Sequence, residues 1–125
     1  IGVQSKASPV MYESLKAGKI LKSEELKIQD SIADGLCGGI EEGSITFKIT
    51  QKNASKVILV KEESIKKAIR LLWEKDNQVV EGAGAVGAAV VIENKEQFKN
   101  KKTVIIISGG NIDNKLFDEI TKVSK

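Results

Sequence analysis

The sequence predicts an α/β protein in which a mostly parallel sheet carries helices on both faces. Residues 104–107 (VIII) form an uninterrupted apolar run of β-branched side chains. Such a run, without polar alternation, is typical of a strand buried on both of its faces, as in a parallel sheet. Residues 57–60 (VILV) form a second run of this kind, and residues 62–76 have the apolar spacing of an amphipathic helix.

The composition is that of one soluble globular domain. The 125 residues are enough for one modest core, and 41% hydrophobic with 30% charged residues is typical of soluble proteins. No apolar run is long enough to cross a membrane, and no signal-peptide pattern is present. The net charge of +3 comes from interspersed acids and bases, and only 4% of the residues are aromatic, which argues against nucleic acid as a partner.

Cys37 is the single cysteine, so the chain cannot form an internal disulfide. This favours a reducing, cytoplasmic location. The chain contains no histidine that could act as the base for a cysteine nucleophile, so a catalytic thiol is not expected.

Pro9 marks the start of the first predicted helix, because the first helical turn tolerates a residue without an N–H. Residues 1–3 are expected to be the stub of a strand, and Gly18 is the expected end of the helix. Residues 23–30 are polar and charged, and they predict a mobile surface loop.

Residues 44–53 fit two patterns. Ile45, Phe47 and Ile49 alternate with polar residues, which is typical of a strand. A helix is the alternative, since short apolar runs mislead in both directions.

The helix at residues 62–76 is predicted from an apolar stripe on one helical face. The stripe consists of Ile65, Ala68, Ile69, Leu72 and Trp73. Glu62 and Glu63 occupy the first turn, where negative charge suits the helix dipole. Trp73 is expected to lie in the core rather than at a ligand.

Ser108, Gly109 and Gly110 come directly after the apolar run at residues 104–107. Open α/β sheets bind their ligands at the carboxyl ends of their strands. A hydroxyl followed by two glycines offers one hydrogen-bonding group and a backbone that a flat ligand can approach. An ordinary glycine turn is the alternative.

Residues 82–87 (GAGAVG) formally satisfy the dinucleotide-binding pattern G-x-G-x-x-G. That site also needs a preceding strand and an acidic residue about twenty positions further on. Only a very short strand at residues 79–80 is expected, and Ile107 and Ser108 stand at the later position, so we exclude a dinucleotide site. The small residues instead predict a helix N-terminus that packs closely against a strand or cofactor and presents free N–H groups.

Residues 31–40 contain Asp34-Gly35 and Gly38-Gly39, which cost too much backbone entropy for a long helix. The segment is expected to be a loop of small residues.

Three segments resemble, in the same order, motifs of the pyridoxal-phosphate-dependent threonine (serine) dehydratases. Residues 31–35 (SIADG) resemble the TxADG motif, residues 80–85 (VEGAGA) the VxEGAGA motif, and residues 108–113 (SGGNID) the closing motif. The resemblance covers nearly the whole chain and implies a fold-type II enzyme related to the β-subunit of tryptophan synthase. It makes residues 1–125 the C-terminal part of the large domain of a longer enzyme, and it implies a helix at residues 44–53.

The resemblance implies that the parent enzyme converts L-threonine to 2-oxobutanoate and ammonia, and L-serine to pyruvate, by β-elimination. This places it in amino-acid catabolism and isoleucine metabolism. The few residues after Asn111 fit the short catabolic type. Serine racemase and 3-hydroxyaspartate dehydratase are alternatives within the family. A non-catalytic, self-associating domain is an alternative of another class, because a truncated sheet exposes an edge that a second copy can pair with.

The resemblance assigns cofactor contacts to Ser108, Gly109, Glu81 and Gly35. The Ser108 hydroxyl would bind the pyridine nitrogen of pyridoxal phosphate, and a neutral partner there suits β-elimination. Glu81 would lie beside the ring, although a first-turn acid stabilised by the helix dipole is the alternative. The backbone around Gly35 would lie near the substrate. No catalytic residue is assigned, because the family's Schiff-base lysine motif, S-[FY]-K-x-R-G-A, and phosphate loop do not occur in this sequence, and the 125 residues alone are expected to be inactive.

Asn111 has two interpretations. Short catabolic dehydratases are activated by nucleotides such as AMP at a subunit interface, which makes Asn111 a candidate effector contact in a homo-oligomer. The interpretation we favour is that Asn111 caps the next helix. That helix is expected within residues 113–125, with Leu116, Ile120 and Val123 on its apolar face.

No metal site is expected. Serine racemases bind a divalent cation in the segment that resembles residues 2–10, through a glutamate, a backbone carbonyl and an aspartate. Gln4, Ser8 and Val10 stand at these positions here. A hard cation would therefore lose both carboxylates.

Overall fold

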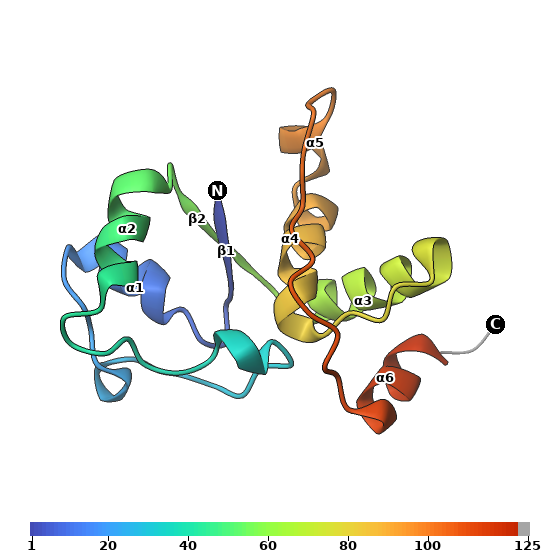
Figure 1. Cartoon of the computed structure of the whole chain (residues 1–125), viewed down its shortest axis with the longest axis horizontal. Coiled ribbons are helices and arrows are strands. Elements are labelled where there is room, and N and C mark those ends of the chain that lie inside the picture. The colour runs from blue at the N-terminus through green and yellow to red at the C-terminus, as the bar shows by residue number, and fades with distance from the viewer. Residues whose placement is uncertain (123–125) are drawn as a thin grey trace.

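A two-stranded parallel sheet lies between two groups of helices in the computed structural model, which describes residues 1–122 (Figure 1). β1 (Gly2–Ser5) pairs with β2 (Val57–Val60), with Gly2 opposite Val57 and Ser5 opposite Val60. α1 (Val10–Ala17) and α2 (Ile45–Asn53) lie on one side of the sheet, and α3 (Glu62–Asp76) and α4 (Gly82–Glu93) lie on the other. The predicted α/β class, with parallel strands and helices on both faces, is confirmed.

The elements before β2 follow the predictions closely. α1 begins directly after Pro9 and ends at Gly18, which has the left-handed φ of 71° that glycine adopts without strain. α2 is a helix, as the resemblance implied, and only Phe47 of its apolar residues is buried. Two short 3₁₀ turns, η1 (Ser23–Glu25) and η2 (Asp34–Leu36), lie within the segments predicted as loops.

α3 has the predicted bounds, and Ile65, Ala68 and Ile69 are fully buried. The expectation that Trp73 lies in the core is wrong, because this residue is 36% exposed. It lies at the edge of the core, where its ring packs edge-on against the ring of Phe117 at a centroid distance of 5.5 Å.

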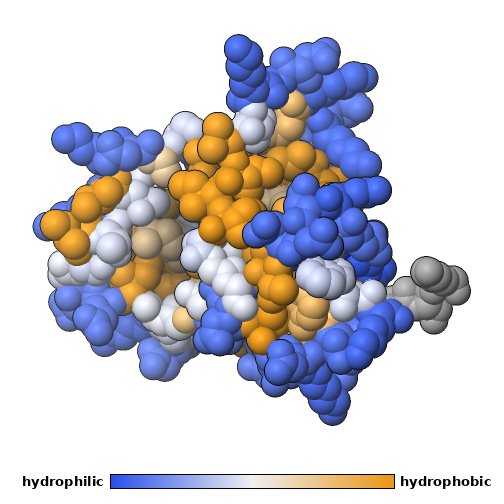
Figure 2. Space-filling model, turned by 45° about the vertical axis from the view of Figure 1, so that its right-hand side comes forward, coloured by the Kyte–Doolittle hydropathy of each residue, from blue (hydrophilic) through white to orange (hydrophobic). Residues whose placement is uncertain are grey.

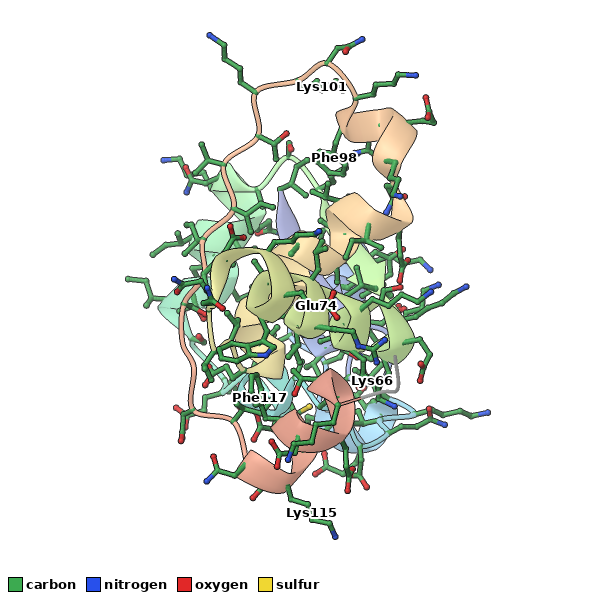
Figure 3. All side chains as sticks on the ribbon, turned by 90° about the vertical axis from the view of Figure 1, so that its right-hand side faces the viewer. Lys66, Glu74, Phe98, Lys101, Lys115 and Phe117 are labelled. Carbon is green, nitrogen blue, oxygen red and sulfur yellow. The ribbon has the colours of Figure 1, made fainter. Side chains whose placement is uncertain are left out.

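α4 is the central helix of the core, since it packs on α3, on both strands and on η2. α5 (Lys95–Phe98) follows it directly. α6 (Asn114–Thr121) lies against α3, with Phe117 between them and Ile120 buried (Figure 3). Val123, the third predicted apolar position of this helix, lies outside the described residues. Among residues 1–122, no helix combines the length and apolar character that a membrane crossing requires.

The predicted buried strand at residues 104–107 is wrong for this chain. The segment is extended but belongs to no sheet, and Val104 and Ile106 are 92% and 82% exposed. Ile105 alone packs on the core, over Gly87 of α4. A strand requires a neighbour for its backbone hydrogen bonds, and no strand among residues 1–122 pairs with this segment. Residues 79–80 also form no strand, although Val80 is buried.

Candidate cofactor site

The N-terminus of α4 is the place where the three sequence motifs meet. A β-carbon on Gly82 would lie 1.9 Å from the carbonyl oxygen of Ile32, and one on Gly84 would lie 2.9 Å from the carbonyl oxygen of Gly109. Both positions therefore require glycine, because each backbone touches another segment. The prediction that small residues allow close packing of this helix is confirmed, with residues 31–36 and 108–111 as the neighbours.

Glu81 precedes α4 and makes two hydrogen bonds to residues 108–111 (SGGN). Its backbone N–H donates to the carbonyl of Gly109 at 3.1 Å, and its Oε2 accepts from the backbone N–H of Asn111 at 2.9 Å. A β-carbon on Gly109 would lie 2.7 Å from Glu81 Oε1. Glu81 thus acts as the support of the turn that follows Ser108, a role that neither earlier interpretation of this residue contained.

Ser108 and Gly35 lie at the same end of α4. The Ser108 side chain is exposed, and no other group among residues 1–122 hydrogen-bonds to its hydroxyl. A β-carbon on Gly35 would lie 3.2 Å from Cβ of Ala83, in the first turn of α4, and the Gly35 N–H donates to Asp34 Oδ1 at 2.8 Å. The predicted site residues from three distant parts of the chain are therefore gathered at one helix end.

Asn111 does not cap α6, and the interpretation we favoured is wrong. Asp113 occupies the cap position, and its Oδ1 accepts from the Leu116 N–H at 3.0 Å. The chain first makes a tight bend, in which the Ile112 N–H donates to the Gly110 carbonyl at 3.0 Å, and α6 begins at Asn114, within the expected residues 113–125. The side chain of Asn111 is exposed.

Glu62 is the residue whose role sequence reasoning missed. Its carboxylate accepts hydrogen bonds from the Ser5 hydroxyl at 2.5 Å, the Ser31 hydroxyl at 2.7 Å and the Ile32 N–H at 2.8 Å. Glu63, next in the chain, pairs with Lys66 at 3.1 Å on the exposed face of α3 and has no other side-chain partner among residues 1–122. The two acids look alike in the sequence, and only the tertiary fold distinguishes them.

The segment that resembles a metal site in serine racemases has a structural role here. Gln4 is buried, and its Oε1 accepts from the Tyr12 N–H at 3.1 Å near the start of α1. Val10 is buried, and the buried Ser8 hydroxyl has no partner among the described residues. Within residues 1–122, no three His, Cys, Asp or Glu side chains are grouped as metal ligands.

Comparison with known proteins identifies the family. The model of the family described as "Pyridoxal-phosphate dependent enzyme" matches residues 1–109, which include residues 31–36, the start of α4 and the first two residues of the third segment, Ser108 and Gly109. This chain belongs to that family. It is 42% identical to the L-threonine ammonia-lyase of Thermotoga maritima over 96% of the chain and 29% of the relative. It is also 42% identical to the serine racemase of Dictyostelium discoideum, over 82% of the chain and 31% of that protein.

A solved structure agrees with the sequence relatives. The processed threonine deaminase isoform 2 of Solanum lycopersicum superposes with a TM-score of 0.81 at 29% identity, over 98% of this chain and 35% of that one. The chain thus spans about a third of the length of its relatives, with 29% and 35% in these two cases. Family membership confirms the resemblance that the three motifs carried.

As a member of the pyridoxal-phosphate-dependent family, the chain has residues that fit one part of a cofactor site. The Ser108 hydroxyl is exposed and makes no hydrogen bond to another group among residues 1–122, and the missing side chain of Gly109 leaves room for the Glu81 carboxylate beside its backbone. These groups suit the edge of a flat aromatic cofactor. Ser108 and Gly109 would hold the ring edge, with Glu81 as their support.

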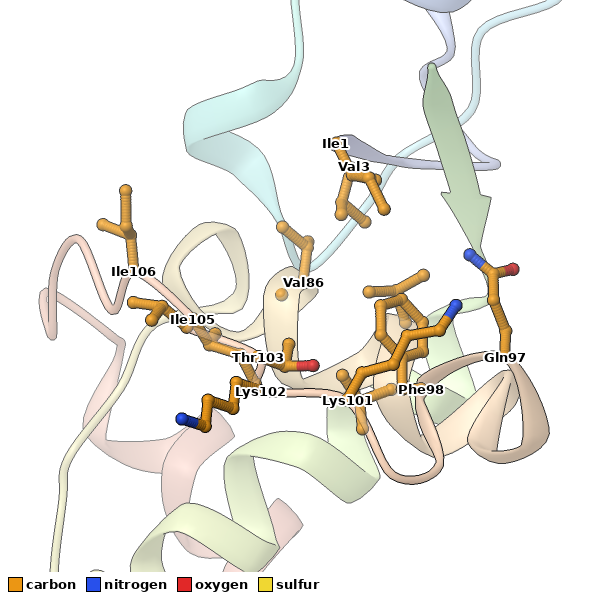
Figure 4. Close-up of a pocket in the computed structure, with 14 residues that line it drawn as sticks. Ile1, Val3, Val86, Gln97, Phe98, Lys101, Lys102, Thr103, Ile105 and Ile106 are labelled. Carbon is orange, nitrogen blue, oxygen red and sulfur yellow. The ribbon is translucent and has the colours of Figure 1, made fainter. Parts of the chain in front are cut away.

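An apolar groove of about 480 Å³ lies between the start of β1, α4 and residues 101–106 (Figure 4). Val3, Val86 and Ile105 are among the residues that line it, and Ser108 is not. Apolar residues also gather in the middle of one face of the molecule (Figure 2). The groove therefore lies along residues 103–106, part of the segment that was predicted as a strand but pairs with no strand among residues 1–122.

Proposed function

We propose that this chain is part of a pyridoxal-phosphate-dependent threonine dehydratase, which converts L-threonine to 2-oxobutanoate and ammonia and also acts on L-serine. The observation that carries the proposal is the meeting of residues 31–36, the start of α4 and residues 108–111, where the Ser108 hydroxyl makes no hydrogen bond to another group among residues 1–122. The similarity to an L-threonine ammonia-lyase supports it. Because the relatives are longer, the activity would belong to a longer protein that contains these residues as the C-terminal part of its large domain.

Pyridoxal phosphate, when bound, supplies an electron sink for the amino-acid substrate. In this proposal, the Ser108 hydroxyl would hold the ring nitrogen of the cofactor as a neutral partner, which would favour β-elimination. Glu81 holds Ser108 in place indirectly, because its contacts with Gly109 and Asn111 fix the backbone on the carboxyl side of Ser108. Gly35 lies against Ala83 in the first turn of the same helix, and in this proposal its backbone would lie near the substrate.

The experiment that tests the proposal is an assay of the full-length protein with pyridoxal phosphate and either L-threonine or L-serine. We expect release of the 2-keto acid and ammonia from both. Serine racemase is the second candidate, because the Dictyostelium enzyme is as similar in sequence as the lyase. Formation of D-serine without keto acid would favour the racemase, and keto acid from 3-hydroxyaspartate alone would favour the other dehydratase.

The isolated chain should be inactive, since its lysines lack the sequence context of the family's Schiff-base residue. The measurement is keto-acid release by residues 1–125 with added pyridoxal phosphate, compared with the full-length protein. Activity of the isolated chain would contradict this expectation. A cytoplasmic location is consistent with the exposed free thiol of Cys37.

A nucleotide effector of the AMP type is proposed at Asn111 in a homo-oligomer. The exposed side chain and the assignment of the helix cap to Asp113 support it. We expect Asn111→Ala in the full-length protein to weaken AMP activation without changing the activity measured in its absence. Unchanged activation would remove Asn111 from the effector site.

A non-catalytic, self-associating domain is the candidate of another class. The exposed side chains of Val104 and Ile106 on an extended, unpaired segment favour it. Such association would describe the isolated chain, whereas dehydratase activity would describe the longer protein.

A further inference from the structure

The Glu62 carboxylate links three separate parts of the chain. It stands in the first turn of α3 and receives hydrogen bonds from the end of β1, through Ser5, and from residues 31–32. The two hydroxyls make further bonds, because Ser5 Oγ accepts from the Ala7 N–H and Ser31 Oγ accepts from the Ala33 N–H, each at 3.0 Å. A carboxylate with several donors is held more firmly than a surface acid.

Ile32 connects this cluster with the cofactor site. Its N–H donates to Glu62 Oε2 at 2.8 Å, and its carbonyl oxygen lies where a β-carbon of Gly82 would be, at 1.9 Å. Residues 31–33 are therefore held between the first turns of two helices, α3 on one side and α4 on the other. A shift of Glu62 would move the backbone that leads into Gly35.

We propose that Glu62 is a positioning residue, which sets the place of residues 31–35 against the N-terminus of α4 and thereby the affinity for the amino-acid substrate. The inference rests on the proposed function, because it assigns those residues to the substrate side of the site. Glu62 acts through Ile32 and does not touch the substrate. Small displacements of positioning groups have large kinetic effects, since a shift of about 1 Å costs up to about 100-fold in rate.

The chain offers a matched control. Glu62→Ala and Glu63→Ala each remove one negative charge from the first turn of α3, so both lose the same favourable interaction with the helix dipole. Only Glu62 bonds to residues 31–32, whereas the Glu63 side chain is 75% exposed and pairs with Lys66. Glu62→Gln is the conservative variant, because its amide oxygen still accepts from the Ile32 N–H.

In the full-length enzyme, we expect Glu62→Ala to raise KM for L-threonine about tenfold or more, with a smaller change in kcat. Glu62→Gln should restore KM to within about threefold, and Glu63→Ala should leave it within about twofold of the wild type. A purely structural role would lower Tm without this split between KM and kcat. Equal KM values in the two alanine variants would overturn the inference.

Hydrogen exchange of the full-length protein gives a second readout that does not depend on activity. Glu62→Ala should increase the exchange of the Ile32 and Ala33 amides, and Glu63→Ala should not. If Glu62→Ala does not fold, Ser31→Ala removes the hydroxyl bond to Glu62 and should show the same changes at a smaller size. Unchanged protection of these amides in the Glu62 variant overturns the inference. If the amides exchange faster in the variant but the wild-type protein has no lyase activity, the proposed function fails and the contact of Glu62 with residues 31–33 stands.

Discussion

Glu81 stands at the N-cap position of α4, but its side chain makes no hydrogen bond to the helix. Its carboxylate instead accepts from the Asn111 N–H at 2.9 Å, which holds the turn after Ser108. We expect Glu81→Ala to destabilise the fold by about 1–2 kcal/mol, because the Asn111 N–H loses a charged acceptor. It should also lower kcat/KM of the full-length protein. Chemical denaturation and steady-state kinetics measure the two effects.

Glu74→Ala is the control for Glu81→Ala, since Glu74 is exposed on α3 and lies outside the site. Its free energy of unfolding should stay within about 0.5 kcal/mol of the wild type. An equal loss in both variants would contradict the role of Glu81 as a support.

Ser108 should behave in the opposite way to Glu81. Its side chain is exposed and unpaired among residues 1–122, so Ser108→Ala should leave the free energy of unfolding unchanged within about 0.5 kcal/mol. Loss of a hydrogen bond to the cofactor should lower kcat of the full-length protein by about 10- to 100-fold. A shift of the cofactor absorbance would accompany it. Full activity of Ser108→Ala would remove the hydroxyl from the proposed site.

At the scale of elements, α4 offers two glycines whose substitution separates close backbone contact from ordinary packing. A β-carbon at Gly82 would meet the backbone carbonyl of Ile32, which cannot move without shifting the loop. A β-carbon at Gly87 would meet Cγ2 of Ile105 at 2.6 Å, the end of a side chain that can rotate. Gly82→Ala should therefore destabilise by about 2–3 kcal/mol.

Gly87→Ala is the matched control for Gly82→Ala. It should change the free energy of unfolding by less than about 1 kcal/mol, because the higher helix propensity of alanine offsets the local adjustment. Denaturation midpoints of both variants check the pair. Similar losses at the two positions would show that overall helix packing, rather than the Ile32 contact, decides the cost.

The elements also show which features sequence patterns determine. The apolar periodicity predicted both ends of α3 correctly. Ile65, Ala68 and Ile69 are buried because they lie on the same apolar stripe of the helix, which the local sequence shows. Residues 44–53 carried strand-like alternation, and yet they form α2 with Phe47 as its single buried apolar residue. Local patterns describe which residues are apolar but not which neighbours are available to cover them.

The site followed the same rule. The motif resemblance named Ser108, Gly109, Glu81 and Gly35, and the structure gathers these residues at the N-terminus of α4. Their contacts with a cofactor stay a prediction. Glu62 could not be distinguished from Glu63 by sequence, because its partners, Ser5 and Ser31, come from distant segments. Side-chain hydrogen bonds across such separations depend on the tertiary fold, which a linear pattern does not contain.

At the scale of the whole molecule, the sheet among residues 1–122 has no strand that pairs with the apolar run at residues 104–107. The run has the composition of a buried strand, but the sheet of the described residues contains only β1 and β2. Val104 and Ile106 consequently face solvent next to the apolar groove at β1. An extended segment with free N–H and C=O groups is a template for pairing with another chain.

We therefore expect the isolated chain to self-associate through residues 103–107, and Val104→Lys with Ile106→Lys to abolish this. Lysine on an exposed edge opposes strand pairing by repulsion and by the cost of burying its charge. Ile45→Lys with Ile49→Lys on α2 is the control, because these side chains are also exposed, at 69% and 51%, but lie on a helix. Light scattering over a concentration series should give oligomer masses for the wild type and the control and a monomer mass for the edge variant. A monomeric wild type, or equal dissociation by both double variants, would exclude this edge as the interface and leave the longer protein as the only context for residues 104–107.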